Sequence, residues 1–167
     1  MAASPPGDGP HGGLQSRHVR CTKPVPMSPA AAATIRKPTP GLRVVVADDN
    51  RDAATALAMV LRDEGYEVFE VYRGDAVLEL TAQFRPDVLI LDIGMPGLTG
   101  FEVAHALRRS LGQACPVLIA VTAWNQPAAR ELGRASGFSH YLTKPCSTDE
   151  LIAILESLPR RGGTKKP

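Results

Sequence analysis

Five short apolar runs recur along the chain, and segments with helical spacing separate them. The runs are Leu42–Ala47, Tyr66–Val71, Asp87–Leu91, Val117–Val121 and Phe138–Leu142. Some of them, such as the DVLIL of residues 87–91, are almost continuously apolar, which is typical of strands buried on both faces. The alternation of strands with helices predicts a parallel sheet that is covered by helices on both sides.

The intervening segments place apolar residues three and four positions apart, as amphipathic helices do. The first is expected to end at Gly65 and to bury Ala56, Leu57, Val60 and Leu61. The next three are expected over residues 75–84, around Val103, Ala104, Leu107 and Leu111, and over residues 127–136. The last is expected to begin with a capping box, Ser147-x-x-Glu150, and to bury Leu151, Ile154, Leu155 and Leu158.

Five βα units leave few possible topologies, because crossovers between parallel strands are right-handed. The doubly wound strand order 2-1-3-4-5 is the best match, so the expected fold class is an α/β three-layer sandwich. In such sheets ligands bind at the carboxyl ends of the strands, near the point where the strand order reverses. Functional residues are therefore expected at that edge.

The two ends of the chain differ from its middle in composition and charge. Residues 1–40 contain eight prolines and four glycines but few large apolar side chains, so this tail is expected to be disordered. The folded domain is expected over residues 41–159, followed by a basic disordered tail over residues 160–167. Each tail carries +4 and the whole chain +2, which leaves −6 for the middle. An acidic folded part argues against nucleic-acid binding.

Several other classes of protein are disfavoured. No apolar run reaches the roughly 18 residues that cross a bilayer, and the first residues lack the apolar core of a secretory signal. Cys21, Cys115 and Cys146 show neither metal-binding nor disulfide spacing. Unpaired, reduced cysteines are typical of the cytoplasm, which is the expected location.

Ionisable and hydroxyl side chains stand at the ends of four of the five expected strands. Asp48 and Asp49 follow the first strand, Asp92 the third, Thr122 the fourth and Lys144 the fifth. Taken singly, each residue has an ordinary explanation as a turn, cap or surface residue. Parallel strands bring all four strand ends to one edge of the sheet, and this convergence predicts a functional site.

Three carboxylates at one edge would either hold a proton or bind a cation. Two carboxylates about 4 Å apart near a protein surface repel by roughly 4 kcal/mol at an effective dielectric of about 20. Oxygen ligands without histidine or cysteine favour Mg²⁺, which keeps several waters that a phosphate can replace. A lysine and a threonine hydroxyl suit the phosphoryl oxygens. One aspartate can then attack phosphorus and form an aspartyl phosphate.

With these motifs, residues 41–158 resemble the receiver domain of bacterial two-component response regulators. The matching segments are VVVADDN (44–50), LILDIGMPGLTG (89–100), VTA (121–123) and YLTKP (141–145). The resemblance implies a flavodoxin-like fold of the chemotaxis-regulator type. The loop after Asp92 and the NRDAA of residues 50–54 also resemble receivers that are attached to hybrid histidine kinases.

The resemblance implies a role for each acidic residue. Asp92 looks like the phosphoacceptor. Asp49 and Asp92 resemble direct ligands of Mg²⁺, together with the backbone carbonyl of Gly94. Asp48 resembles the residue that holds the waters of the metal.

The resemblance also implies roles at the fourth and fifth strands. Thr122 and Lys144 match the pair that binds the phosphoryl group. Tyr141 matches the aromatic residue that swings inward on activation, and Lys144–Pro145 matches a peptide bond that the family keeps cis. Trp124, two residues after Thr122, is expected to shield the site, to meet a partner or to pack within its loop.

The implied function is signalling, and the chain is expected not to be an enzyme that turns over a metabolite. It would take a phosphoryl group from a phosphohistidine on a sensor histidine kinase or a histidine phosphotransfer protein, and catalyse only its own phosphorylation and slow dephosphorylation. No second domain is expected to follow. It would therefore act by binding a partner or by passing the phosphoryl group on, with its output through the face formed by the fourth helix, fifth strand and fifth helix.

Three other functions fit parts of the pattern. A flavodoxin-like electron carrier needs a Ser/Thr/Gly-rich phosphate loop after the first strand, where this chain has Asp48-Asp49-Asn50. A phosphohydrolase that forms an aspartyl phosphate normally has a second acid two residues after the nucleophile, where this chain has Gly94. A receiver-like scaffold that binds partners without phosphorylation keeps the fold and stays open.

Overall fold

The computed structural model of the protein describes residues 41–159. The predictions of disordered tails over residues 1–40 and 160–167 lie outside the described residues, and the domain boundaries drawn between them stay predictions. Within residues 41–159, no helix is both long and apolar enough to cross a membrane.

A parallel sheet of five strands forms the centre of the fold, in the order β2-β1-β3-β4-β5. The strands are β1 (Arg43–Ala47), β2 (Glu67–Val71), β3 (Val88–Leu91), β4 (Val117–Thr122) and β5 (His140–Thr143). This arrangement confirms the predicted fold class and strand order. Ala47 of β1 pairs with Leu91 of β3, so the two central strands end level with each other. Asp48 and Asp92, which follow them, are therefore neighbours at the carboxyl edge.

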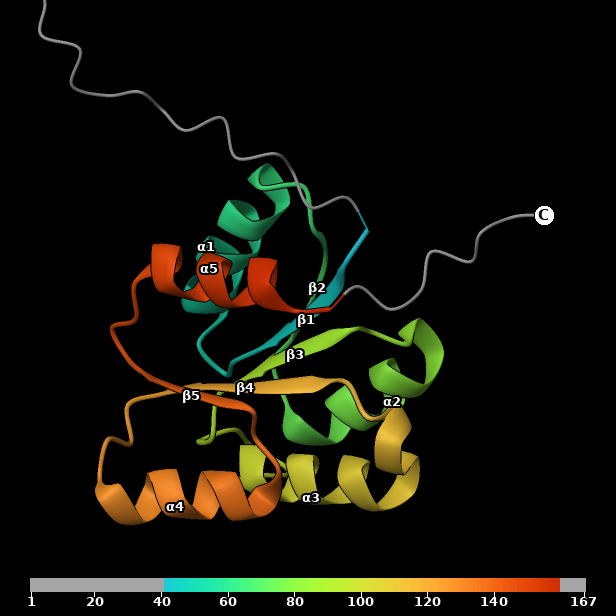
Figure 1. Cartoon of the computed structure of the whole chain (residues 1–167), viewed down its shortest axis with the longest axis vertical. Helices are drawn as coiled ribbons and strands as arrows, with labels where there is room; N and C mark the ends of the chain where they lie inside the picture. The colour runs from blue at the N-terminus through green and yellow to red at the C-terminus, as the bar shows by residue number, and fades with distance from the viewer. Residues whose placement is uncertain (1–40, 160–167) are drawn as a thin grey trace, which may run out of the picture. The chain divides into compact units, whose positions relative to one another are not determined.

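Helices cover both faces of the sheet. They are α1 (Arg51–Asp63), α2 (Gly74–Phe84), α3 (Gly100–Leu111), α4 (Pro127–Ser136) and α5 (Thr148–Ser157), with a short 3₁₀ helix over Gly112–Ala114. Figure 1 shows α1 and α5 on one face and α2, α3 and α4 on the other. Because side chains alternate along a strand, Val44 and Val46 enter the core under α1 and α5, whereas Val45 enters the core under α2 and α3.

The predicted inner face of α1 is wrong in part. Ala54, Ala58 and Leu61 are buried, whereas Ala56 and Val60 are exposed. The helix carries two overlapping apolar stripes, and helical spacing alone does not decide between them. The stripe with two alanines faces the sheet, since short side chains let a helix approach a sheet closely. Val60 belongs to the stripe that is left on the surface.

Two smaller expectations about the helices also differ from the structure. Leu111 ends α3 with 39% of its surface exposed, because the helix runs past the edge of the core there. Ser147 is the N-cap of α5 as expected, but its side chain accepts no hydrogen bond, so the predicted capping box with Glu150 does not form. The capping box of the structure is at α3, where Thr99 and Glu102 bond each other's backbone N–H groups.

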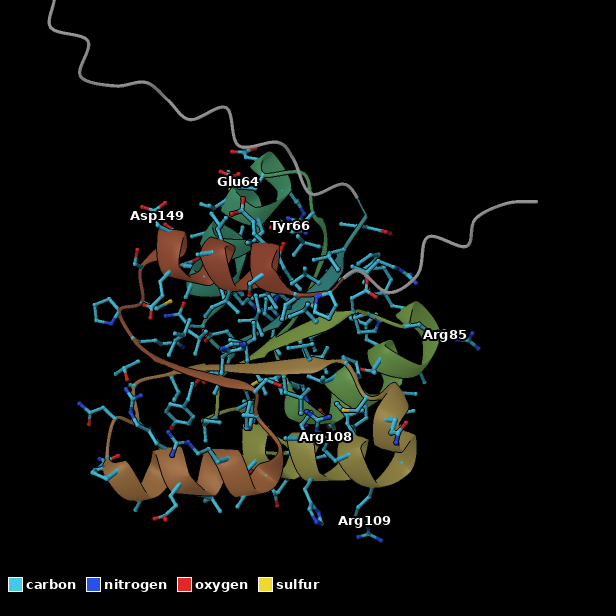
Figure 2. The ribbon with its side chains drawn as sticks, in the orientation of Figure 1. Glu64, Tyr66, Arg85, Arg108, Arg109 and Asp149 are labelled. Carbon is cyan, nitrogen blue, oxygen red and sulfur yellow. The ribbon has the colours of Figure 1, made fainter. Side chains whose placement is uncertain are left out.

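The outer edge of β2 is covered at one point by an arginine. Glu67 and Val71 bond β1 through their backbones, so the carbonyl of Val68 points away from the sheet. Arg62 of α1 donates to this carbonyl at 2.8 Å and to the carboxylate of Glu70 at 2.9 Å. A charged side chain thus occupies a hydrogen-bonding group that an edge strand normally exposes. Figure 2 shows how side chains fill the space between the sheet and its helices.

Candidate functional site

Three carboxylates gather at the carboxyl ends of β1 and β3. One oxygen from each of Asp48, Asp49 and Asp92 lies within 4.8 Å of the others. Asp48 is buried, Asp92 is half-buried and Asp49 is exposed. The sheet itself sets this spacing, because the N–H of Asp92 donates to the carbonyl of Ala47 at 2.8 Å.

Backbone amides orient two of these carboxylates. The N–H of Ile93 donates to Asp92 Oδ1 at 2.6 Å, and the N–H of Asn50 donates to Asp48 Oδ1 at 3.0 Å. The N–H of Gly94 lies further from Asp92 Oδ1, at 3.4 Å. In both aspartates the main chain thus holds one carboxylate oxygen, Oδ1, whereas the second oxygen, Oδ2, is left to a side-chain partner.

The side chain of Lys144 bonds the Oδ2 atoms of both Asp48 and Asp92. Its Nζ donates to Asp48 Oδ2 at 2.6 Å and to Asp92 Oδ2 at 2.9 Å. Burial on its own lowers the pKa of the lysine, but the hydrogen bonds and negative charges of the two aspartates outweigh it, so the pKa is raised. The ammonium therefore stays charged at neutral pH. The Lys144–Pro145 peptide bond is cis, as the resemblance implied.

The single positive charge of Lys144 does not balance the negative charges of three carboxylates. Whether a metal ion fits depends on the ligand atoms that the cluster offers. Asp48, Asp49 and Asp92 offer only oxygen atoms, and no other group of acidic, histidine or cysteine side chains among residues 41–159 gathers in this way. Hard oxygen ligands on a partly exposed edge suit Mg²⁺, which needs few protein ligands and keeps waters in its remaining positions. The residues therefore fit the predicted metal.

The residues of β4 and β5 form a second, separate chain of contacts. Thr122 ends β4 and is buried, and its Oγ1 accepts a hydrogen bond from the N–H of Trp124 at 3.3 Å. The hydroxyl of Tyr141 donates to the carbonyl of Trp124 at 2.9 Å. Burial raises the pKa of the Tyr141 phenol, Arg130 opposes this and Asp92 adds to it, so the phenol is a neutral donor at neutral pH. The backbone of Trp124 links the two side chains.

The comparisons with known proteins agree with this geometry. The family model of the response regulator receiver domain matches residues 44–156. The chain belongs to this family. Its curated relatives include the response regulator MprA of Mycobacterium ulcerans, which is 39% identical over 120 residues, and that of Mycobacterium avium, which is 38% identical. Each match covers 72% of this chain and 51% or 52% of the relative. The receiver domain thus spans about half the length of these relatives.

Solved structures share the fold. The chemotaxis response regulator CheY4 of Vibrio cholerae is 30% identical with a TM-score of 0.64, over 69% of this chain and 96% of that chain. A DNA-binding response regulator of the LuxR family from Staphylococcus aureus is 26% identical with a TM-score of 0.65, over 70% of this chain and 97% of that one. Because one similar protein is described as DNA-binding, the expectation that this chain does not bind nucleic acid stays a prediction.

A groove of about 530 Å³ opens beside the site of this receiver domain, between α1 and the start of α5. Its polar end is formed by Asp48 and Lys144. Its remaining lining is mostly apolar: Ala53, Ala56, Leu57, Val60, Val121, Pro145, Cys146 and Thr148. The surface stripe of α1 that the sequence assigned to the core is therefore one wall of this groove.

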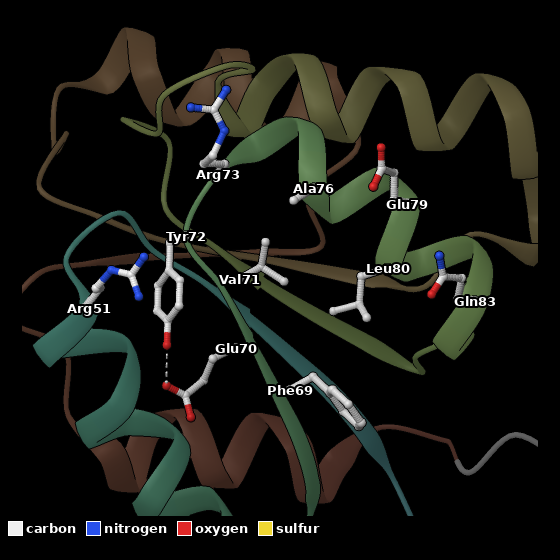
Figure 3. Close-up of a pocket in the computed structure, with 10 residues that line it drawn as sticks. All are labelled: Arg51, Phe69, Glu70, Val71, Tyr72, Arg73, Ala76, Glu79, Leu80 and Gln83. Atoms are coloured by element: carbon white, nitrogen blue, oxygen red, sulfur yellow. Dashed lines mark hydrogen bonds between the residues drawn. The ribbon is translucent and has the colours of Figure 1, made fainter.

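On the far side of α1, a different network ties the receiver domain's first helix to its edge strand. The carboxylate of Glu70 accepts from Thr55 at 2.7 Å, Arg62 at 2.9 Å and Tyr72 at 3.1 Å. Figure 3 shows the bond between Tyr72 and Glu70, with the guanidinium of Arg51 beside the ring. These bonds lower the pKa of Glu70, the one from Thr55 contributing most and burial opposing them. The residue gave no signal in the sequence, since two of its three partners, Thr55 and Arg62, come from another element.

Gly100 is a second residue that sequence reasoning missed. A Cβ at this position would lie 2.5 Å from the carbonyl oxygen of Asp92, and the N–H of Gly100 donates to Ile93 at 3.0 Å. Glycine therefore lets the start of α3 lie against the backbone of the acidic loop. The Thr99-x-x-Glu102 pattern beside it was a readable signal for the start of this helix.

Proposed function

We propose that this receiver domain accepts a phosphoryl group on Asp92 from a phosphohistidine of a sensor histidine kinase or a histidine phosphotransfer protein. The observation that carries this proposal is the position of the Asp92 carboxylate at the end of β3, the middle strand of the sheet, beside Asp48, Asp49 and Lys144. The Oδ1 of Asp92 is fixed by the Ile93 amide, whereas its Oδ2 is bonded by the side chain of Lys144. The side chain of Lys144 can move away from Oδ2, so this oxygen can exchange the lysine for phosphorus, as a nucleophile must.

In the reaction, an oxygen of Asp92 attacks phosphorus in line with the bond to the histidine nitrogen. The new phosphorus–oxygen bond forms as the phosphorus–nitrogen bond breaks, and the imidazole keeps the electron pair and takes up a proton. Lys144 then moves from the carboxylate to a phosphoryl oxygen, and the hydroxyl of Thr122 donates to another. Dephosphorylation is the attack of water on the same phosphorus.

Asp48, Asp49, Asp92 and the backbone carbonyl of Gly94 would hold Mg²⁺, which when bound supplies positive charge to the phosphoryl oxygens. Asp49 and Asp92 are assigned as direct ligands, and Asp48 as the residue that holds the waters of the metal. Asp49 is the exposed member of the cluster and is the easiest to reach.

Replacing Asp92 with Asn tests the proposal. The change keeps the volume and removes the nucleophilic charge, so labelling by acetyl phosphate with Mg²⁺ is expected to fall at least about 100-fold. Asp52→Asn, an exposed aspartate in the first turn of α1, is the matched control and is expected to label normally. The label on the wild type should survive acid and be lost in base. A folded wild type that takes no label would favour the scaffold function instead.

We further propose that the histidine donor docks in the groove beside Lys144. An approaching helix would bury the apolar stripe of α1 while its histidine points toward Asp92. The output partner is proposed to bind through α4, β5 and α5. Leu132 of α4 and Trp124 supply exposed apolar surface there, at 50% and 49% exposure.

The donor surface is tested by Val60→Glu, with Met59→Glu as its control. Both residues are exposed and apolar on α1, but only Val60 lines the groove. With any phosphorylated histidine protein that labels the wild type, Val60→Glu is expected to slow transfer at least about tenfold, a barrier of about 1.4 kcal/mol. Met59→Glu is expected to leave it near the wild-type rate. Labelling by acetyl phosphate, which needs no docking surface, should be equal in all three proteins. If transfer from the histidine donor were also equal in all three, the groove would be rejected as the docking site.

A further inference from the structure

Gly133 stands in the middle of α4, where helix propensity alone would favour alanine. It is buried, and a Cβ at this position would lie 2.7 Å from Cδ2 and 3.0 Å from Cε2 of Tyr141. Any side chain there would overlap the tyrosine ring. The ring of Tyr141 therefore occupies a slot in the surface of α4 that exists because residue 133 is glycine.

Two further contacts define the position of the ring in this slot. Arg130, one turn earlier on α4, has its guanidinium 5.5 Å from the ring centroid and donates to Thr143 Oγ1 at 2.9 Å. The phenol hydroxyl reaches across to the carbonyl of Trp124 at 2.9 Å. The ring is thus held between a helix on one side and the loop after β4 on the other.

The same loop contacts Thr122, because the N–H of Trp124 donates to the threonine hydroxyl at 3.3 Å. A continuous set of contacts therefore runs from Gly133 through the ring of Tyr141 and the backbone of Trp124 to Thr122. We propose that Gly133 is a positioning residue that sets the inward placement of Tyr141 and, through it, the hydrogen bond between Trp124 and Thr122. The part of this inference that concerns phosphorylation rests on the proposed role of Thr122.

A larger residue at position 133 would push the ring out of the slot and away from the Trp124 carbonyl. Trp124 is the one tryptophan in the sequence, so its fluorescence reports this change directly. The test compares Gly133→Ala in the wild type and in a Tyr141→Ala background. In the wild type, Gly133→Ala is expected to shift the emission of Trp124 and to lower the melting temperature. In the Tyr141→Ala background, alanine has no ring to displace, so it should raise the melting temperature through helix propensity and leave the emission unchanged.

Labelling by acetyl phosphate supplies the functional measurement. Gly133→Ala is expected to change the rate at least threefold in the wild type and not at all when Tyr141 is already alanine. If Gly133→Ala alone prevents folding while the double variant Gly133→Ala/Tyr141→Ala folds, the result also supports the slot. A melting temperature raised in both backgrounds with unchanged emission overturns it. If the wild type itself takes no label, the proposed function fails, and the fluorescence and melting experiments still decide the role of Gly133.

Discussion

The two halves of the carboxyl edge are built differently. On β1 and β3, the aspartates are fixed mainly by the main chain: amides of Asn50 and Ile93 bond their oxygens, and the strands pair level beneath them. On β4 and β5, the contacts run between side chains and carbonyls of neighbouring elements, as from Tyr141 to Trp124. The β1–β3 half is held by the sheet, whereas the β4–β5 half is held by contacts that a rotation of one side chain can break.

On the proposed function, this difference separates the phosphoryl chemistry from its readout. A metal and a phosphoryl group need carboxylates at fixed spacing, and the sheet supplies it. A signal needs an element with two arrangements, and Tyr141 has room to adopt a second one because it is only half-buried. Substitutions in the β1–β3 half should therefore have the larger effects on metal binding and labelling. Those in the β4–β5 half should change the lifetime or the transmission of the phosphorylated state, with smaller effects on labelling.

After Asp92→Asn, a large effect is expected from Asp49→Ala in the β1–β3 half. Losing one of the few protein ligands should weaken Mg²⁺ binding about tenfold, or about 1.4 kcal/mol. Isothermal calorimetry with MgCl₂ measures this directly, and Asp52→Ala provides the same change of charge outside the cluster. Equal Mg²⁺ affinity in wild type and Asp49→Ala would remove Asp49 from the metal site.

A smaller effect is expected from Trp124→Ala in the β4–β5 half. Trp124 and Gly94 follow Thr122 and Asp92 by two residues, positions expected to border the path of the attacking water. Gly94 leaves its side open, since a Cβ there would meet nothing within 4 Å. The indole of Trp124 is half-exposed, with its ring centroid 6.3 Å from that of Phe101.

Removing the indole is therefore expected to speed loss of the phosphoryl group severalfold, with uptake little changed, since about 1.4 kcal/mol of barrier corresponds to a factor of ten. Decay of labelled protein after removal of the donor measures it. Leu132→Ala, which deletes another half-exposed apolar side chain on α4, is the control. An unchanged or slower decay in Trp124→Ala would leave partner contact or loop packing as the role of the indole.

The smallest effect is expected at Glu70, which ties α1 to β2 beside the β1–β3 half. Its pKa is lowered in the folded state, so its contribution to stability is present above the pKa of the unfolded chain and is lost as the pH falls through the lower, folded value. Glu70→Gln is expected to reduce the free energy of unfolding at pH 7 by no more than about 1 kcal/mol. Urea unfolding at pH 7 and at pH 3 tests the sign, because the difference between wild type and variant should shrink at the lower pH. A difference that grows on acidification would contradict the linkage.

The sequence predicted the β1–β3 half of the edge more completely than the β4–β5 half. Asp48, Asp49 and Asp92 follow buried strands directly, so the strand pattern alone places them together, and the structure gathers them as expected. Thr122 and Lys144 were found by the same reasoning. The role of each residue came from the resemblance to a family and stays a prediction.

What the sequence did not predict depends on packing between elements. Gly133 contacts Tyr141 across a turn and a strand, and no local pattern marks a glycine that makes room for a distant ring. The prediction of which face of α1 is buried was wrong in part for a related reason. Its two apolar stripes look alike in sequence, and only the distance between helix and sheet selects Ala54 and Ala58 over Ala56 and Val60. The rejected stripe became the wall of the groove, where its apolar character has a functional explanation.

The arginine on the edge of β2 bears on how this domain behaves in a crowded solution. A sheet with a bare outer strand can recruit strands from other molecules, and fibrous aggregates grow in this way. Here an incoming strand would have to displace Arg62 from a backbone carbonyl and from Glu70 at the same time. The guanidinium is therefore expected to hinder the pairing of another strand at this point of β2.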